Sequence, residues 1–143
     1  MSVRTILRNK GDHVVTIAPR TTAEEAAWIM RQCNVGALVV VEGERVLGLL
    51  TQRDLANGLA EDGTALAQRE VRTLMNRNFV SVTLSETTKR VMAQMTLYRA
   101  THIPVMDGDT LAGIVSIGDV VKDRLRDLEL ETNVLRDAYI AVH

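Results

Sequence analysis

Two kinds of apolar pattern alternate along the first half of the chain. A stretch rich in β-branched residues, Val14–Ala18, predicts a strand. A helix follows, because Thr22 and Glu25 have the spacing of a capping box and apolar side chains then recur at helical period: Ala26, Ile29, Met30 and Cys33. We expect this helix to end at Gly36.

A strand pair and a second helix complete the first unit. The apolar run Ala37–Val41 predicts a buried strand, and Val46–Thr51 predicts its partner. Between them lies Glu42-Gly43-Glu44, a hairpin turn in which glycine supplies the positive φ. The predicted order is strand, helix, strand, strand, helix.

The same order recurs 65 residues later, since Val14–Ala56 aligns without a gap on Phe79–Val121. The pattern predicts strands at Phe79–Thr83, Ile103–Met106 and Leu111–Ser116, with Ser85 as the helix N-cap and Arg99–Thr101 as the helix end. Seven aligned pairs are identical: Val15/Val80, Thr22/Thr87, Met30/Met95, Val40/Val105, Gly43/Gly108, Gly48/Gly113 and Asp54/Asp119.

The period of 65 residues is longer than that of solenoid repeats, so it indicates two subdomains. Each unit is too small to bury a large core alone, which favours packing the two sheets face to face. We therefore predict an α+β fold of two β-α-β-β-α repeats with pseudo-two-fold symmetry. The expected parts are a short N-terminal helix in 1–11, a first repeat with its connection in 12–68, a second repeat in 69–122 and a long C-terminal helix in 118–143.

The C-terminal segment carries an apolar stripe with heptad spacing: Val121, Leu125, Leu128, Thr132, Leu135 and Tyr139. A helix of about 24 residues would be about 36 Å long, more than a small domain can cover. We expect part of the stripe to contact a partner chain; the alternative is packing onto the protein's own surface.

Composition and charge exclude several classes. With 17 basic and 18 acidic residues the net charge is −1, so no overall basic field exists for nucleic acid. The longest apolar run is far short of the roughly 20 residues that span a bilayer, and Met1–Gly11 is too polar for a signal peptide. These features predict a soluble cytoplasmic protein that does not act at a membrane.

Reactive and metal-binding residues are sparse. The single cysteine, Cys33, forms no internal disulfide and is expected to be a small buried apolar residue. The histidines His13, His102 and His143 lie far apart, so we expect no zinc site, and the sequence lacks a phosphate loop and a G-x-S-x-G motif.

Each repeat has a hydroxyl followed three residues later by an aspartate where its last strand becomes a helix. These pairs are Thr51 with Asp54, and Ser116 with Asp119. One interpretation is an N-cap with a carboxylate in the first turn. The other is a sugar site, because a carboxylate can accept hydrogen bonds from both hydroxyls of a vicinal diol. The two roles can coexist.

These motifs resemble the tandem cystathionine-β-synthase (CBS) domain pair. The resemblance rests on Gly48–Asp54 and Gly113–Asp119, which share the pattern G-h-h-[T/S]-x-x-D, and on the strand entries Val35–Val40 and His102–Val105. It covers about Asp12–Asp123, and the flanking helices look like those of stand-alone bacterial CBS-pair proteins.

The resemblance implies a regulatory module that binds adenine nucleotides in two clefts between the repeats. It also favours a homodimer in which the C-terminal helix takes part. One site would combine Ser116 and Asp119 with Thr16, Ile17, Ala18, Gly36 and Ala37. The second would combine Thr51 and Asp54 with Ser81, Val82, Thr101, His102 and Pro104. In both, main-chain groups of the first strand would read the adenine edge.

The resemblance also implies that the sites are unequal. Relatives often carry a basic residue before the motif aspartate; Arg53 fills that position in the first repeat, and Gly118 in the second. That residue serves the site of the other repeat's aspartate, so Arg53 is expected to support phosphate at a dominant Asp119 site. Thr101 stands where relatives often have arginine, which weakens the second site unless Arg99 or His102 compensates; alternatively, Arg99 is solvated and His102 is an N-cap or core residue.

The predicted function is a non-catalytic energy or redox sensor that binds AMP, NAD or ATP, has no catalytic cofactor and signals to a protein effector that the sequence does not identify. The alternative is a structural homodimer or adaptor. Catalysis is disfavoured because repetition separates Asp54 from Asp119 and no nucleophile with an adjacent base is evident.

Overall fold

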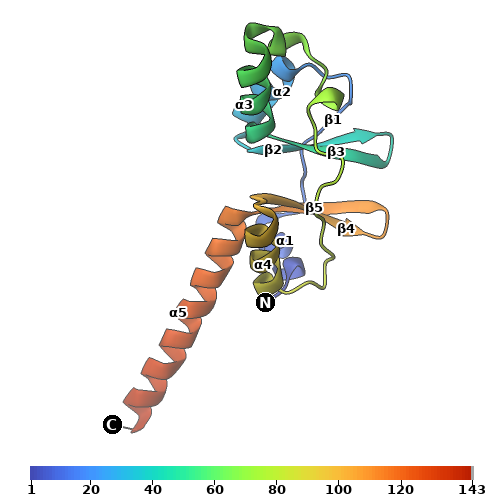
Figure 1. The fold of residues 1–143 in the computed structure, drawn as a ribbon. Coiled ribbons are helices and arrows are strands. Elements are labelled where there is room, and N and C mark those ends of the chain that lie inside the picture. The colour runs from blue at the N-terminus through green and yellow to red at the C-terminus, as the bar shows by residue number, and fades with distance from the viewer. Residues whose placement is uncertain (143) are drawn as a thin grey trace.

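Two stacked sheets, each carrying helices on its outer side, form the protein in the computed structural model, which describes residues 1–142 (Figure 1). The first repeat comprises β1 (Thr16–Ile17), α2 (Ala23–Cys33), β2 (Ala37–Glu42), β3 (Arg45–Thr51) and α3 (Gln52–Asp62). The second comprises α4 (Thr88–Tyr98), β4 (His102–Asp107), β5 (Thr110–Ser116) and α5 (Ile117–Val142). Helix α1 (Val3–Lys10) precedes the first repeat, and the 3₁₀ turns η1 (Gly63–Gln68) and η2 (Val71–Thr73) connect the two.

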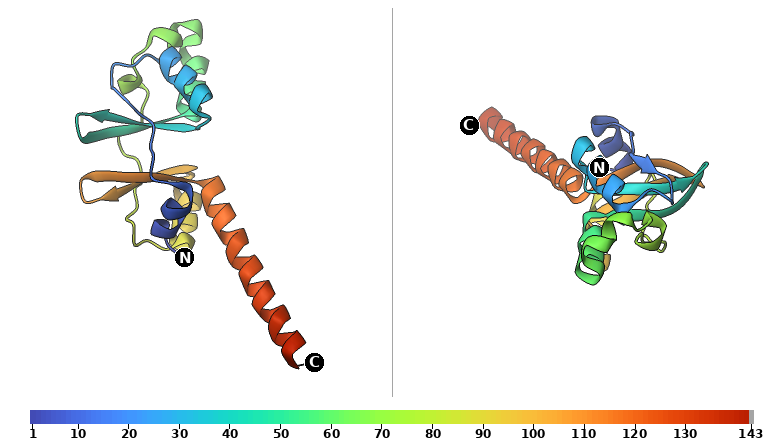
Figure 2. Two further views of the ribbon diagram at one scale, coloured as in Figure 1. Left: turned by 180° about the vertical axis from the view of Figure 1, so that it is seen from behind. Right: turned by 90° about the horizontal axis from the view of Figure 1, so that it is seen from above.

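The two sheets pack through their inner faces, as the sequence predicts. In the first, β1 is parallel to β2 and β2 is antiparallel to β3; in the second, β4 and β5 are antiparallel. A separate apolar cluster lies between the sheets and joins side chains of both: Ala37, Val39, Leu49, Phe79, Leu111 and Ile114. Helices α2 and α3 cover one outer face, and α1 and α4 cover the other (Figures 1 and 2).

The predicted strand at Phe79–Thr83 is wrong, because only a single bridge between Val82 and Val105 forms there. Proline at position 104 is the reason. In the first repeat the N–H of Val39 donates to the carbonyl of Val15. Pro104 occupies the position equivalent to Val39 and has no N–H to donate to Val80. The predicted strand Val14–Ala18 is likewise shorter, Thr16–Ile17.

Equivalent residues of the two repeats cap equivalent helices, which the sequence prediction did not fully anticipate. Thr22 forms the predicted capping box with Glu25, but the cap of α4 is Thr87, its repeat equivalent, and not Ser85. Asn34 and Arg99 end α2 and α4 in the left-handed region, each at φ 52°, so α2 does not extend to Gly36.

Cys33 is exposed, contrary to the expectation of a buried residue. It lies in the last turn of α2, where the buried face of the helix, which includes Ala26 and Met30, has already ended.

The segment before each repeat packs into the core of the other repeat. Val3, Ile6 and Leu7 of α1 belong to the cluster built on Val91 and Ile103 of the second repeat. Conversely, Val71 and Met75, which precede the second repeat, lie in the first repeat's cluster with Met30, Leu38 and Leu50. We call the two segments that precede the repeats the lead-in segments; each one completes the hydrophobic core of the other repeat.

Helix α5 begins against α4 and β5 and then leaves the body of the protein (Figure 2). Its apolar side chains are 47–66% exposed: Val121, Leu125, Leu128, Leu130, Val134, Leu135, Tyr139 and Ile140. Within residues 1–142 the protein therefore covers only part of each of these side chains. The predicted helix extends to His143, which lies outside the described residues. In that described part, no helix is long and apolar enough to cross a bilayer.

Candidate functional site

Both strand-to-helix junctions form reciprocal caps, so the N-cap interpretation holds at each. Thr51 Oγ1 accepts from the Asp54 N–H at 3.3 Å, and Asp54 Oδ2 accepts from the Thr51 N–H at 2.9 Å and its hydroxyl at 3.1 Å. In the second repeat, Asp119 Oδ2 accepts from the Ser116 N–H at 2.8 Å, and Ser116 Oγ accepts from the Asp119 N–H at 3.2 Å. Each carboxylate is thereby held at a helix start with its orientation fixed.

A cleft of about 330 Å³ lies between the repeats at Asp54, a volume in the range of small-molecule sites. Thr51, Arg53 and Asp54 line one side, and the second repeat lines the other with Asn78, Phe79, Val80, Tyr98, Arg99, Ala100, Thr101 and His102. Four residues predicted for the second site, Thr51, Asp54, Thr101 and His102, therefore meet here.

Three other residues expected at this site do not line the cleft. Val82 and Pro104 are buried in the second sheet. Ser81 instead lines a groove between the two hairpins, together with Gly43 and Gly108.

Arg53 lies in the Asp54 cleft, which differs from the expected position beside Asp119. The residue is in the first turn of the helix that Thr51 caps, so its side chain leaves α3 on the side that Asp54 also lines. Arg99, at the left-handed end of α4, adds a second guanidinium. Both arginines are exposed, and within residues 1–142 neither has a carboxylate partner.

The carboxylate of Asp119 forms an ion pair with a lysine. The ammonium of Lys10, at the end of α1, lies 2.6 Å from Asp119 Oδ2 and donates to the carbonyl of Ile114 at 2.8 Å. The hollow beside this pair is about 80 Å³, about a quarter of the volume of the Asp54 cleft. Sequence reasoning missed Lys10, although the repeat offers a signal: the residue 65 positions on is Met75, so the charge exists in one half only.

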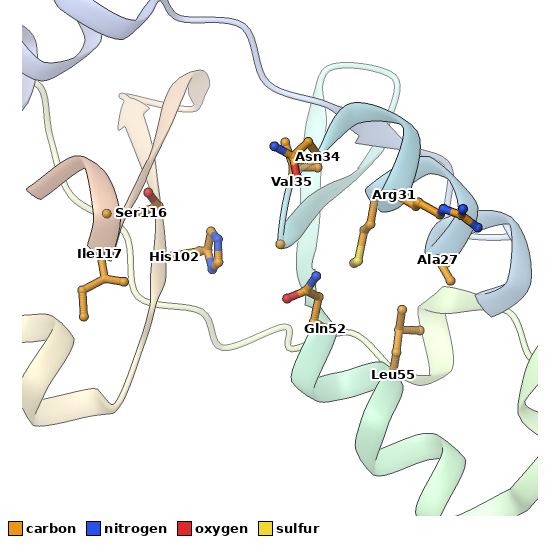
Figure 3. A pocket seen from close by; sticks show the side chains of 12 residues that line it. Ala27, Arg31, Asn34, Val35, Gln52, Leu55, His102, Ser116 and Ile117 are labelled. Carbon is orange, nitrogen blue, oxygen red and sulfur yellow. The ribbon is translucent and has the colours of Figure 1, made fainter. Parts of the chain in front are cut away.

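Ser116 and Gly36 line a different and wider cavity of about 630 Å³ (Figure 3). Its walls are α2 and α3 on one side and His102, Ser116, Ile117 and Gly118 on the other. The imidazole of His102 points across it toward Gln52 (Figure 3). A Cβ at Gly36 would lie 3.0 Å from His102 Cε1, so a larger residue there would require the imidazole to shift by a few tenths of an ångström.

The remaining residues expected with Asp119 are dispersed. Ile17 and Ala37 are buried in the first sheet, Ala18 is exposed beyond β1, and Thr16 lines grooves beside the hairpins. The structure thus gathers one set of predicted residues around Asp54 and separates the other set around Asp119.

Two groups near the clefts have shifted pKa values. Burial lowers the pKa of His102; Asp119 opposes this effect and Lys10 adds to it, so the net shift favours the neutral ring at pH 7. Burial alone would raise the pKa of Asp119, but hydrogen bonds from Lys10 and from Ser116 lower it below its ordinary value. At pH 7 the positive charge of the Asp54 cleft therefore comes from its arginines and not from His102.

Comparison with known proteins agrees with the duplicated architecture. The family model described as the CBS domain matches residues 3–61 and 71–126. The chain belongs to the CBS-domain family. A CBS pair is a regulatory module. The two CBS domains of this pair are the two repeats described above.

Relatives and solved structures support the same assignment. The CBS domain-containing protein YhcV of Bacillus subtilis is 33% identical over 112 residues, which are 78% of this chain and 79% of YhcV. The crystal structure of the CBS-domain protein ATU1752 from Agrobacterium tumefaciens is 41% identical, with a TM-score of 0.85, and covers 87% of this chain and 99% of that one.

The CBS domain pair of protein MJ0100 has been solved in complex with 5′-methylthioadenosine and S-adenosyl-L-methionine. It is 25% identical, has a TM-score of 0.77, and covers 90% of this chain and 98% of its own. Some structural neighbours of this chain thus bind adenosine-containing ligands.

Proposed function

We propose that this CBS pair is a non-catalytic sensor that binds an adenine nucleotide, AMP, NAD or ATP, in the Asp54 cleft. The observation that carries the proposal is the composition of that cleft. It joins a fixed carboxylate, two guanidinium groups that form no ion pair within residues 1–142, and an apolar wall from both repeats in about 330 Å³. The adenosine ligands of the related MJ0100 pair support the same ligand class.

The carboxylate of Asp54 suits the ribose. Its hydrogen bonds within the cap all go to Oδ2, which leaves Oδ1 to accept from the sugar hydroxyls. Within residues 1–142 no basic side chain pairs with Asp54, so a ligand displaces no ion pair there.

The main chain of Val80 suits the adenine edge. Pro104 has no N–H to donate to the Val80 carbonyl, and the Val80 N–H also has no hydrogen-bond partner among the residues that the structure describes. An N–H and a carbonyl on the cleft wall match an acceptor and an amino group of adenine. Phe79 and Leu49 provide the adjoining apolar surface.

Arg53 and Arg99 suit the phosphate. Guanidinium groups bind phosphate through charge-assisted, bidentate hydrogen bonds, and both line the cleft. This arrangement changes the preference drawn from the sequence: we propose the Asp54 cleft as the first site and the Asp119 side as a secondary one, since Arg53 is at the former and Lys10 already neutralises the latter.

Calorimetry and a thermal-shift screen test the proposal with AMP, ADP, ATP, NAD, NADH and S-adenosylmethionine. A ligand at 100 times its Kd stabilises the native state by about 2.7 kcal/mol. We expect Asp54→Ala to abolish most of the binding and the matched variant Asp119→Ala to retain it. Equal losses in both variants, or no stabilisation by any of the six compounds, would contradict the proposal.

A second function, a homodimer or adaptor, is favoured by the exposed apolar stripe of α5. We propose that two copies pair through this stripe, consistent with a heptad seam. Light scattering on the full chain and on a variant lacking residues 129–143 tests this: the full chain should have the mass of a dimer and the truncated chain that of a monomer. A dimer that survives truncation would make the helix incidental to assembly.

A further inference from the structure

The ion pair of Lys10 and Asp119 bears on how the secondary site opens. We propose that Lys10 is a two-position latch: it holds Asp119 when the Asp119 side is empty, and it transfers to Asp123 when the hydroxyls of a nucleotide take its place. This inference rests on the proposed function for its ligand, an adenine nucleotide, but it concerns the secondary site at Asp119 and not the Asp54 cleft.

The closed position is fixed from two directions. Lys10 Nζ donates to Asp119 Oδ2 at 2.6 Å and to the carbonyl of Ile114 at 2.8 Å. The two side chains are 31% and 22% exposed, so the pair is partly shielded from solvent. Oδ2 also accepts from the Ser116 N–H. A ribose that approaches this carboxylate therefore competes with a donor supplied by the protein itself.

The open position is a carboxylate with an unused oxygen. Asp123 is only 3% exposed; its Oδ2 accepts from the hydroxyl of Thr88 at 3.0 Å, while its Oδ1 has no hydrogen-bond partner among the described residues. A buried carboxylate oxygen without a donor is unfavourable. An ammonium group that reached it would satisfy it.

The distance between the two positions is short. Asp119 and Asp123 are four residues apart on α5, about one helical turn or about 6 Å along the axis. Both line the same hollow as Lys10. The lysine ammonium is carried on a flexible four-carbon stem, which allows it to take more than one position in this hollow.

The other half of the molecule lacks both parts of the latch. At the repeat offset of 65 residues, Lys10 corresponds to Met75 and Asp123 corresponds to Gly58. Met75 packs against Gly48, and Gly58 is enclosed by Leu66 and Leu74. The device is therefore specific to the Asp119 side, and the Asp54 cleft has no counterpart.

Other charged groups surround the hollow without occupying either position. Lys122 and Arg126 line it, and in the described chain neither forms an ion pair with Asp119 or Asp123. Lys122 thus provides a matched control, since it carries the same charge at the same hollow but does not hold the carboxylate.

Site-resolved NMR titration with AMP tests the latch. The amide signals of Ser116–Asp119 report the Asp119 side, and those of Asn78 and Thr101 report the Asp54 cleft. We expect Lys10→Met to tighten AMP binding at the Asp119 side by up to about fivefold, the equivalent of a partly exposed ion pair. Lys122→Met should leave that affinity unchanged, and neither variant should alter the affinity at the Asp54 cleft.

The transfer to Asp123 is tested by a double-mutant cycle. Asp123→Asn should weaken AMP binding at the Asp119 side in the otherwise native chain, because the displaced ammonium loses its acceptor. The same change should have no effect in the Lys10→Met background. Thermal melting of each variant checks that it is folded, and Lys10→Met alone carries the first test if Asp123→Asn is not.

The outcomes separate the two proposals. Weaker or unchanged binding at the Asp119 side in Lys10→Met overturns the latch, as does an Asp123→Asn effect that persists without Lys10. If AMP moves only the Asn78 and Thr101 signals in every variant, the latch is overturned and the proposed function stands. If AMP moves neither set in any variant, both are overturned.

Discussion

Leu7 of α1 lies against Gly113 of β5 so closely that a Cβ at position 113 would come within 2.8 Å of both Cδ atoms of the leucine. The contact joins the N-terminal helix to the second repeat, where Leu7 belongs to the core. Gly113→Ala should therefore destabilise the fold by about 1–3 kcal/mol, the usual cost of overpacking a core. Denaturant unfolding measures the loss of unfolding free energy. In the double variant with Leu7→Ala, the two losses should be less than additive, because the new methyl group at position 113 fills part of the space that the leucine leaves.

Arg99 should show opposite effects on stability and on ligand binding. Its φ of 52° is in the left-handed region, which disfavours side chains other than glycine or asparagine. Arg99→Gly relieves this strain but also loosens the unfolded chain, so we expect a gain of up to about 1 kcal/mol in unfolding free energy. The same variant should bind AMP more weakly, as calorimetry would show. A variant that is both less stable and unchanged in affinity would contradict both assignments.

Arg53 should distinguish phosphate from nucleoside. If its guanidinium binds the phosphate in the Asp54 cleft, Arg53→Met should weaken AMP about tenfold and leave adenosine within about twofold, since one charge-assisted hydrogen bond is worth about 1.5–3 kcal/mol at most and the site is exposed. Lys89→Met, which removes an exposed charge of α4, serves as the control. Equal loss of AMP and adenosine affinity would show that Arg53 does not select the phosphate.

Acid should reveal the Lys10–Asp119 pair without any ligand. Burial raises the pKa of Asp119, but the donors Lys10 and Ser116 lower it overall. A depressed carboxylate pKa contributes stability above the pKa of the unfolded state, about 3.9, and this contribution is lost as the pH falls through the folded value. We expect a higher pKa of Asp119 in Lys10→Met by carbon-detected NMR titration, and a smaller loss of stability below about pH 4. An identical Asp119 titration in the native chain and the variant would mean that the ion pair is absent in solution.

The repeat made most of the fold predictable. The alignment of Val14–Ala56 with Phe79–Val121 gives the element order twice, and the capping box of Thr22 and the glycine turns at Gly43 and Gly108 lie where local chemistry puts them. These features depend on residues within a few positions of one another. The missing strand near Val82 was also readable, because proline at 104 removes a donor that Val39 supplies in the first repeat.

The site was less predictable because it depends on contacts between distant segments. Lys10 and Asp119 are 109 residues apart, and no local pattern indicates that α1 packs on the second repeat. The position of Arg53 depends on the direction in which a side chain leaves the first turn of α3, which periodicity does not specify. The motif thus identified the carboxylates, but not which of them carries a counter-ion.

The exchange of lead-in segments has a consequence for how the chain can be divided. A cut within 63–69 would yield two fragments, and each would carry residues of the other fragment's hydrophobic core. These residues are Val3, Ile6 and Leu7 in the N-terminal fragment and Val71 and Met75 in the C-terminal one. Neither fragment can complete its core alone, so the two should associate when they are co-expressed. Energy transfer between a fluorophore on each fragment would report that association.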